Sequence, residues 1–364
     1  MNKDYLGIII PKSTYDRMTV LSVNVLSMFS IWEKTAAKHN LIPCYFRFFD
    51  ISPGQQMMNA YVLENDRYIL KQIPAPKVIY SRVLDNLPAY QSHIKSLMKD
   101  GKVIFNVPNY DIEKLTVHKL LTQDPYINKH LPRTELFSIE QLRDMAYHYK
   151  KLILKKNYGE FGIGTMKLEK INDYWRLSYK TEGDKELKQE DFKKTLPPIL
   201  QKRVYDHTYL IQELIPLATL DGKPFDMRVA VQKNIQGQFQ VSGIMCKVAQ
   251  NQDFLTNGAQ GGTTFSLEEI APYTHSDIPY QTLVKNIKEF ALYVANNLDH
   301  HYPSLADLGF DIGITREGFP YFIECNFISD YVSGLFINGE ILQPDWEKVF
   351  STPIDYAKYL LDKY

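Results

Sequence analysis

The sequence predicts an α/β protein that is divided into two or three structural units. Its 364 residues are too many for one small domain, because a single hydrophobic core seldom serves more than about 250–300 residues. Hydrophobic residues make up 45% and charged residues 23% of the chain, as in ordinary globular proteins. Strand-like and helix-like segments alternate along it, which is typical of α/β folds.

Composition also excludes several classes of protein. Lys plus Arg and Asp plus Glu both total 42, and this zero net charge argues against nucleic acid as a partner. We expect no membrane association, since no apolar run approaches the roughly 20 residues that a membrane helix needs. Cys44, Cys246 and Cys325 lie far apart without metal-ligand spacing. We therefore expect a reduced, cytoplasmic protein with no disulfide framework and no zinc site.

The first unit is expected over about residues 1–110. Short apolar runs separated by helical patterns indicate an open α/β domain. Asn65-Asp66 is the expected turn of a hairpin within it. The expected strands are 6–11, 43–49, 77–83 and 103–107, and the expected helices are 20–39 and 90–99.

The next segment begins with a helix and continues with strands. Ser138 followed by Gln141 is a capping-box signature, so a helix should run from there to about Tyr149. Strands are expected at 151–156, 165–170 and 210–215. The charged stretch 182–194 is interpreted as a solvated loop and helix face.

The last segment has long antiparallel strands at 227–234 and 240–250, which turn around Gln236-Gly237. Residues 282–299 carry apolar side chains at helical spacing, so a buried helix is expected there. Two further strands, 310–315 and 320–326, should form a hairpin through a loop at 316–319.

This hairpin carries the sharpest chemical signal. If Thr315 faces Pro320, Asp311 lies opposite Glu324, and Asn326 shares the face of Glu324, whereas Ile323 and Cys325 point away. Directly opposed carboxylates destabilise a sheet, and a hard divalent cation such as Mg²⁺ would offset their repulsion. The alternative is a solvent-facing hairpin with incidental acids. The apolar flanks favour the metal site.

A glycine-rich loop at 159–164 joins two expected strands and follows Lys155. Glycines let backbone amides approach an anion, and a lysine can reach a phosphate. The loop lacks the context of a P-loop or of a dinucleotide fingerprint. Taken alone, a structural hairpin and a solvated lysine explain these residues better than a phosphate flap does.

The order of these features resembles the ATP-grasp superfamily of carboxylate–amine ligases, in particular its YheC/YheD branch, which is associated with the endospore coats of bacilli. The order runs from Glu113-Lys114 through Lys155 and the glycine loop to 210–215, then Asp226-Met227-Arg228, residues 254–262, Asp311 and the 324–326 segment. The resemblance covers nearly the whole chain, and is clearest over 110–330.

The resemblance implies an ATP-grasp fold, with ATP and Mg²⁺ between two subdomains. It implies units at 1–110 (pre-domain), 111–217 (lid-bearing subdomain) and 218–364 (metal-bearing subdomain). It also implies a role for each residue of a larger set. The resemblance assigns the nucleotide phosphates to Lys114 and Lys155, and the flap to Gly159, Gly162 and Gly164. It assigns adenine and ribose to Gln212, Glu213, Leu214 and Ile215, and magnesium to Asp311, Glu324 and Asn326. It places Arg228, Lys247 and Asn257 near the transferred phosphate, with Gly261-Gly262 beside them.

Two positions depart from the pattern of many relatives. Lys155-Lys156 stands where they have Lys-Pro, and Phe327 follows Asn326 where they soon have proline. The second departure lies on the side of the site where the acceptor substrate would bind. Arg82, in the segment Tyr80-Ser81-Arg82, resembles a residue that reaches the active site in relatives, and a surface salt bridge explains it equally well.

The function implied is ADP-forming ligation of a carboxylate to an amine through an acyl phosphate. The expected substrates are ATP with amino acids, peptides or proteins, and an association with the spore coat is implied. A small-molecule kinase and a spore-coat structural protein that retains the nucleotide-binding fold are the alternatives. The intact hairpin, Lys114, Lys155 and Arg228 argue against a purely structural role.

Overall fold

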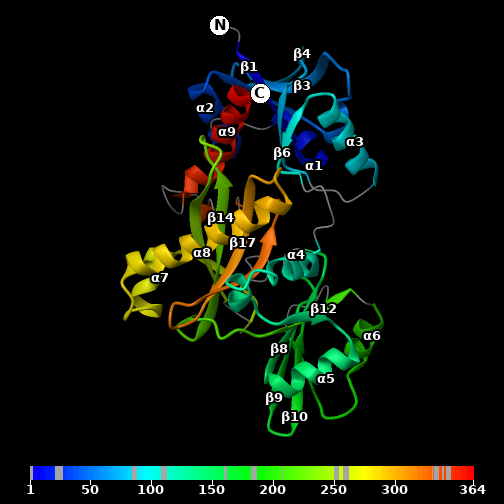
Figure 1. Cartoon of the computed structure of the whole chain (residues 1–364), viewed down its shortest axis with the longest axis vertical. Coiled ribbons are helices and arrows are strands. Elements are labelled where there is room, and N and C mark those ends of the chain that lie inside the picture. The colour runs from blue at the N-terminus through cyan, green and yellow to red at the C-terminus, as the bar shows by residue number, and fades with distance from the viewer. Residues whose placement is uncertain are drawn as a thin grey trace.

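The computed structural model has, over its described residues, three six-stranded β-sheets, of which the third along the chain lies between the other two on the long axis of the molecule (Figure 1), and a small two-stranded sheet. Both chain ends lie at the end formed by the first sheet. The described residues are 3–20, 28–83, 88–107, 113–159, 162–181, 187–206, 208–249, 254–256, 262–329, 331, 336–337, 340–341 and 346–364.

The first sheet has the strand order β4-β3-β2-β1-β5-β6. Strands β2, β1, β5 and β6 are parallel, and the β3–β4 hairpin joins β2 as an antiparallel edge. Asn65 and Asp66 both have positive φ, at 50° and 62°, which confirms the predicted turn. The elements are β1 (Asp4–Ile9), α1 (Lys12–Tyr15), α2 (Met28–Lys38), β2 (Leu41–Phe46), β3 (Met57–Glu64), β4 (Arg67–Pro74), β5 (Val78–Ser81), α3 (Pro88–Lys99) and β6 (Val103–Phe105).

These bounds confirm the predicted strands and the 90–99 helix to within a few residues. The helix predicted at 20–39 is α2 from Met28 onward, and its earlier part, 21–27, lies outside the described residues.

The second sheet is antiparallel throughout its described strands, in the order β11-β10-β9-β8-β12-β7. Ser138 Oγ accepts a hydrogen bond from Gln141 N (3.1 Å) at the start of α5, which confirms the predicted helix start. The elements are α4 (Lys114–Leu121), β7 (Thr134–Leu136), α5 (Ile139–His148), β8 (Lys151–Lys156), β9 (Met166–Ile171), β10 (Tyr174–Tyr179), β11 (Lys188–Phe192), α6 (Pro198–Asp206) and β12 (Tyr209–Glu213).

One prediction for this sheet is wrong. Residues 188–192, part of the stretch interpreted as a loop and helix face, form the edge strand β11. Its mixed charged side chains suit an edge, because charge protects an exposed strand from pairing with another chain. Residues 182–186 lie outside the described residues.

The third sheet has the order β16-β15-β14-β17-β18, with β13 on β14. The long strands predicted around Gln236-Gly237 are β14 and β15, and the predicted 282–299 helix is α8. The elements are β13 (Thr219–Leu220), β14 (Lys223–Lys233), β15 (Phe239–Val248), β16 (Thr263–Ser266), α7 (Leu267–Thr274), α8 (Tyr280–His301), β17 (Asp307–Ile314), β18 (Pro320–Asn326), β19 (Phe336–Ile337), β20 (Glu340–Ile341) and α9 (Trp346–Lys363).

Alternation along β14 separates two faces of this sheet. Val229 and Val231 pack in the core formed with α8. Ala230 packs in a second core, which α9 shares with α2 and with residues of the first sheet. Because side chains alternate along a strand, Asp226 and Arg228 lie on the face of Ala230, opposite α8. This face is where the candidate site forms.

Candidate active site

A cleft opens between the second and third sheets, and its free volume of about 120 Å³ is smaller than the roughly 300–1,000 Å³ of typical small-molecule sites. Nine of the predicted nucleotide and metal residues line it: Lys114, Lys155, Gly162, Gln212, Glu213, Leu214, Ile215, Asp311 and Glu324. The fold therefore brings together residues that lie up to about 210 positions apart in the sequence.

The two lysines approach the cleft from different elements. Lys155 is the penultimate residue of β8, only 8% exposed, and its Nζ donates to Ile323 O (3.3 Å) on β18. Burial, together with the charge of Lys114, lowers the pKa of Lys155 to about 8, against the opposing effect of Glu324 and Asp311. Lys114 opens α4 and forms an ion pair with Glu324 (Nζ–Oε2 2.9 Å).

Asn157 fixes α4 against the end of β8. Its Oδ1 accepts from Leu115 N (2.9 Å), and its Nδ2 donates to Glu113 Oε2 (2.6 Å). The amide thus satisfies an N–H group in the first turn of α4, where no intrahelical partner exists. As a result, Lys114 and Lys155 are held side by side at the cleft.

Residues 212–215, at the end of β12, form one side of the cleft. Gln212 Nε2 donates to Thr134 Oγ1 (2.6 Å), and Leu214 N donates to Lys151 O (3.1 Å). Apolar side chains line the cleft beside them, namely Ile153, Ile215, Leu217, Leu255 and Ile323. A planar base can stack on an apolar wall of this kind beside the end of a strand. The geometry therefore suits the prediction that residues 212–215 hold adenine.

A buried ion network forms the floor, on strands β14, β15 and β17. Arg228 Nε donates to Asp311 Oδ1 (2.7 Å), and Lys247 Nζ lies 3.1 Å from the same oxygen. Lys247 also lies 3.0 Å from Asp226 Oδ1, and Thr256 Oγ1 donates to Asp226 Oδ2 (2.6 Å). The two predicted catalytic cations thus converge on one carboxylate that lines the cleft.

The charges of this network move the two carboxyl pKa values in opposite directions. Burial alone would raise the pKa of Asp311, but Arg228 and Lys247 outweigh it and hold that pKa well below its usual range. At Asp226 burial dominates over Lys247, and the pKa is raised. The pKa of Lys247 is raised, because its two carboxylate neighbours outweigh the effect of burial. Asp311 therefore stays ionised at neutral pH.

The hairpin register confirms that Asp311 lies opposite Glu324. Two details of the prediction are wrong. Ile314, not Thr315, pairs with Pro320, and a bulge at Ile323 restores the register. The bulge turns Ile323 toward the cleft, where its Cδ1 would lie 3.3 Å from a Cβ on Gly313, although alternation had pointed it away.

The predicted magnesium ligands suit that ion chemically. Asp311 and Glu324 supply facing carboxylate oxygens at the cleft, the donors that Mg²⁺ takes when it also contacts phosphates. Asn326 Nδ2 donates to Gly309 O (3.3 Å), and this residue is not among those that line the cleft. Within the described part of the chain, no three His, Cys, Asp or Glu side chains gather as a metal cluster. The predicted set has two carboxylates and one amide.

The glycine flap is described only in part. Gly159, Gly162 and Gly164 have φ of 112°, 66° and 82°, so each adopts a conformation that favours glycine. Only Gly162 lines the cleft, and a Cβ on Gly164 would lie 2.7 Å from the Tyr209 hydroxyl. Asn257 and Gly261 lie outside the described residues.

Sequence reasoning assigned no role to several residues that the fold brings to this site. Asp226 and Thr256 line the cleft. His118 lines an adjoining hollow beside Lys155, and burial together with the charge of that lysine lowers the pKa of His118 to about 4. Asp226 could have been found from the sequence, because it precedes Arg228 by two residues on one strand and therefore shares its face.

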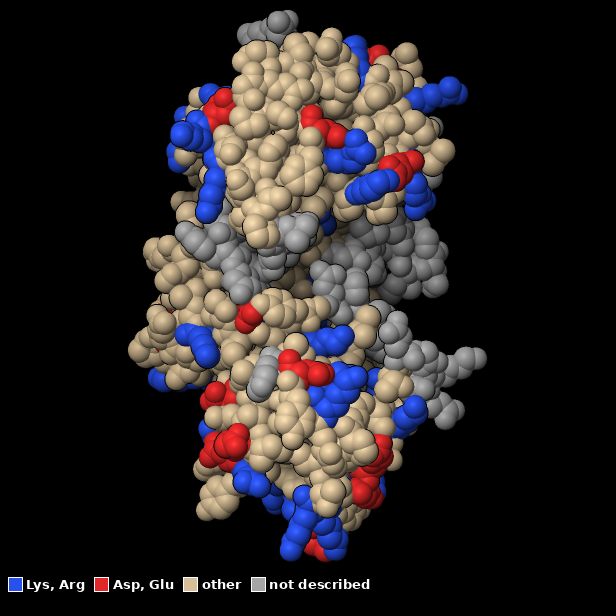
Figure 2. Space-filling model, turned by 90° about the vertical axis from the view of Figure 1, so that its right-hand side faces the viewer, with Lys and Arg blue, Asp and Glu red and all other residues tan. Residues whose placement is uncertain are grey.

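On the face drawn in Figure 2, acidic and basic side chains are interspersed over the described surface.

A sequence model of the family "YheC/D like ATP-grasp" matches residues 102–360, well over half of the chain. The chain belongs to this ATP-grasp family. It is 29% identical over 278 residues to the "Endospore coat-associated protein YheD" of Bacillus subtilis (strain 168), over 70% of this chain and 57% of that protein. To "Endospore coat-associated protein YheC" of the same strain it is 24% identical over 337 residues, 88% of each chain. The chain therefore spans little more than half the length of YheD.

Solved structures share the fold of this ATP-grasp chain. The "ATP-grasp ligase PsnB complexed with minimal precursor, Mg, and ADP" superposes with a TM-score of 0.55 at 14% identity, over 100% of both chains. The "macrocyclase MdnC bound with precursor peptide MdnA from Microcystis aeruginosa MRC" gives 0.51 at 12% identity, over 99% of this chain and 100% of that one. These likenesses confirm the ATP-grasp fold predicted from the sequence. None of the helices of this ATP-grasp chain, over its described residues, is long and apolar enough to span a membrane.

Proposed function

We propose that this ATP-grasp protein is an ATP-dependent carboxylate–amine ligase that forms an amide or peptide bond through an acyl phosphate. The observation that carries the proposal is the cleft in which Lys114 and Lys155 face the Asp311–Glu324 hairpin, with Arg228 and Lys247 directly behind it. Cations from two sheets that converge on one cleft suit a polyphosphate ligand.

In this proposal Lys114 and Lys155 bind the nucleotide phosphates, and residues 212–215 hold adenine and ribose. Asp311 and Glu324, with Asn326, would hold Mg²⁺, which when bound supplies charge neutralisation at the phosphates. Gly159, Gly162 and Gly164 cover the phosphates as a flap that excludes water from the reactive intermediate.

The reaction has two balanced steps. A substrate carboxylate oxygen attacks the γ-phosphorus of ATP, the bond to the β,γ-bridging oxygen breaks, and ADP leaves. An amine then attacks the acyl carbon, inorganic phosphate leaves with the former carboxylate oxygen, and the amine loses a proton. Arg228, with Lys247 and Asn257, stabilises charge on the transferring phosphoryl group.

The substrate class is proposed from the relatives' names. Two relatives are named as endospore coat-associated proteins, and the fold neighbours are named as complexed with a minimal precursor or bound with a precursor peptide. We therefore propose amino-acid, peptide or coat-protein substrates, with a cytoplasmic site of action and a spore-coat association. In the same proposal residues 1–110 form a pre-domain, 111–217 the lid-bearing subdomain and 218–364 the metal-bearing subdomain.

An ATP-consumption screen over amino acids and coat peptides, with mass spectrometry of the products, tests the proposal. ADP and phosphate should appear in equal amounts, and fast only when acid and amine are both present. Arg228→Lys should abolish the reaction, whereas the same change at the exposed Arg143 should not. AMP with pyrophosphate would refute the mechanism, and a stable phosphorylated product would favour a kinase. Tight ATP binding without turnover would favour a structural coat protein.

A further inference from the structure

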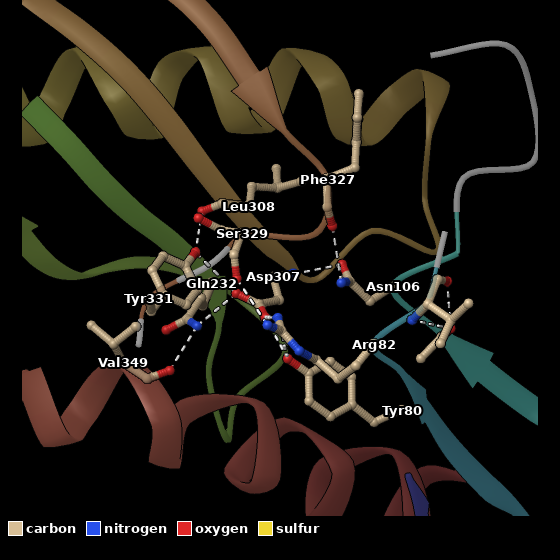
Figure 3. A network of polar contacts seen from close by, with 12 residues as sticks. Tyr80, Arg82, Asn106, Gln232, Asp307, Leu308, Phe327, Ser329, Tyr331 and Val349 are labelled. Atoms are coloured by element: carbon tan, nitrogen blue, oxygen red, sulfur yellow. Dashed lines mark hydrogen bonds and ion pairs between the residues drawn. The ribbon is translucent and has the colours of Figure 1, made fainter. Parts of the chain in front are cut away.

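A buried polar network joins the first sheet to the third, with Asp307 at its centre (Figure 3). This first residue of β17 is 1% exposed. Its Oδ1 accepts from Gln232 Nε2 (2.7 Å) and Tyr331 OH (3.1 Å), and its Oδ2 accepts from Tyr80 OH and from Arg82 Nη1 (3.1 Å). Because Tyr80 lies in β5 and Arg82 follows that strand directly, the carboxylate ties the first sheet to the strand that carries Asp311.

Arg82 makes a second contact that an ion pair alone would not need. Its Nη2 donates to Ser329 O (2.8 Å), while Ser329 Oγ accepts from Arg228 Nη1 (2.5 Å). Ser329 is fully buried and follows closely after the metal-ligand strand β18. One serine therefore connects an arginine of the first sheet to the arginine of the candidate active site.

The surroundings leave Ser329 little freedom. A Cβ placed on Gly309 would lie 2.3 Å from Ser329 Oγ and 3.2 Å from Arg228 Cδ, so these side chains pack directly on the backbone of β17. Asn106 of the first domain holds the same segment, since its Nδ2 donates to Phe327 O (3.1 Å) and its Oδ1 accepts from Asp307 N (3.1 Å).

We infer that Arg82 is a positioning residue that fixes, through Ser329, the orientation of the Arg228 guanidinium in the active site. This inference rests on the proposed ligase function for its kinetic consequences, but the contacts themselves do not. The alternative is that Arg82 only clamps two domains together through its ion pair with Asp307. Holding the two domains together requires only a positive charge opposite Asp307. Positioning Arg228 also requires the Nη2 group of Arg82, which donates to Ser329 O.

Kinetics of four variants distinguish these two roles. Arg82→Met and Ser329→Ala should each lower kcat for ADP release by about tenfold, the range of one charged hydrogen bond, with KM for ATP nearly unchanged. The double variant should be no slower than either single one, because both changes break the same connection. Arg82→Lys keeps the charge opposite Asp307, so it should retain the melting temperature of the parent but not its kcat.

Asp355→Asn is the control, because it removes the negative charge from another contact between the first sheet's unit and α9, the His39–Asp355 pair at 2.7 Å, away from this network. Its kcat should match that of the parent. Full kcat in Arg82→Lys, or losses that add in the double variant, would overturn the positioning role. If Arg82→Met fails to fold, Ser329→Ala and Arg82→Lys decide the question.

A second readout does not depend on turnover. The Nε–H signal of Arg228 in ¹⁵N-labelled protein, assigned by its loss in Arg228→Lys, should exchange with water about tenfold faster in Ser329→Ala and in Arg82→Met, but not in Asp355→Asn. An unchanged signal in both network variants would overturn the inference, whether or not the ligase is active. Faster exchange in a protein that forms no amide would leave the inference standing and refute the proposed function.

Discussion

The charge state of Lys155 should set the pH dependence of ATP binding. Burial lowers its pKa to about 8, so the free protein carries this charge at pH 7 and loses about nine tenths of it by pH 9. A lysine stabilises a polyphosphate only when it is protonated, so the contribution is present below about pH 8 and lost as the pH rises through that value. Bound ATP holds the proton in place, and binding at pH 9 should therefore take up about one proton.

The expected weakening is about tenfold in affinity between pH 7 and pH 9, or about 1.4 kcal/mol. Calorimetry with a non-hydrolysable ATP analogue and magnesium measures it, and repetition in buffers of different ionisation enthalpy counts the proton. Lys155→Arg keeps its charge over the whole range, so its affinity at each pH corrects for the titration of ATP itself.

Lys156→Arg, at the exposed next position, is the matched control and should follow the parent. If the ATP affinities of the parent and of Lys155→Arg changed in parallel between pH 7 and pH 9, the lowered pKa of Lys155 would not control ATP binding. If Lys155→Met left the affinity at pH 7 unchanged, the residue would have no place at the phosphates.

Three further changes test the floor of the cleft. Glu324→Gln should abolish magnesium-dependent ADP release while circular dichroism stays unchanged, and full activity at ordinary magnesium concentrations would contradict the ligand assignment. Asp311→Asn removes the buried carboxylate that Arg228 and Lys247 share and should lower the free energy of unfolding by about 3–5 kcal/mol in thermal denaturation; Asp191→Asn, in an exposed pair, should cost far less. Gly309→Ala should push Ser329 aside and lower kcat more than it raises KM for ATP, and a fully active variant would show that this close packing is dispensable.

The parts of the fold that sequence predicted well depend on local pattern. Strands β8, β14 and β17 were recognisable from short apolar runs, and Asn65-Asp66 from turn chemistry. The facing of Asp311 and Glu324 followed from the register of one hairpin, although the bulge that turns Ile323 into the cleft left no signal.

Contacts between distant segments could not be predicted in the same way. Helix α9 was not predicted from the sequence. Its apolar face packs against α2 and the first sheet, which precede it in the chain by more than 230 residues. The link from Arg82 to Ser329 spans 247 positions and depends on a backbone carbonyl, which any residue at 329 would supply. Only the assembled fold distinguishes such an arginine from a surface one.

Repulsion between Asp311 and Glu324 was the sequence argument for a metal, but the fold offsets this repulsion with its own cations. Arg228 and Lys247 pair with Asp311, and Lys114 pairs with Glu324. The total charge at the cleft favours bound cations more strongly.

Among the described residues that line the cleft or pair with those that do, four side chains carry positive formal charge and four carry negative charge. They are Lys114, Lys155, Arg228 and Lys247 on one side, and Glu213, Asp226, Asp311 and Glu324 on the other. These charges cancel, so they cannot by themselves neutralise the roughly four negative charges of ATP in a partly buried site, where unpaired charge is costly. A nucleotide that binds here must therefore bring cations with it, and facing carboxylate oxygens are the groups that would receive them.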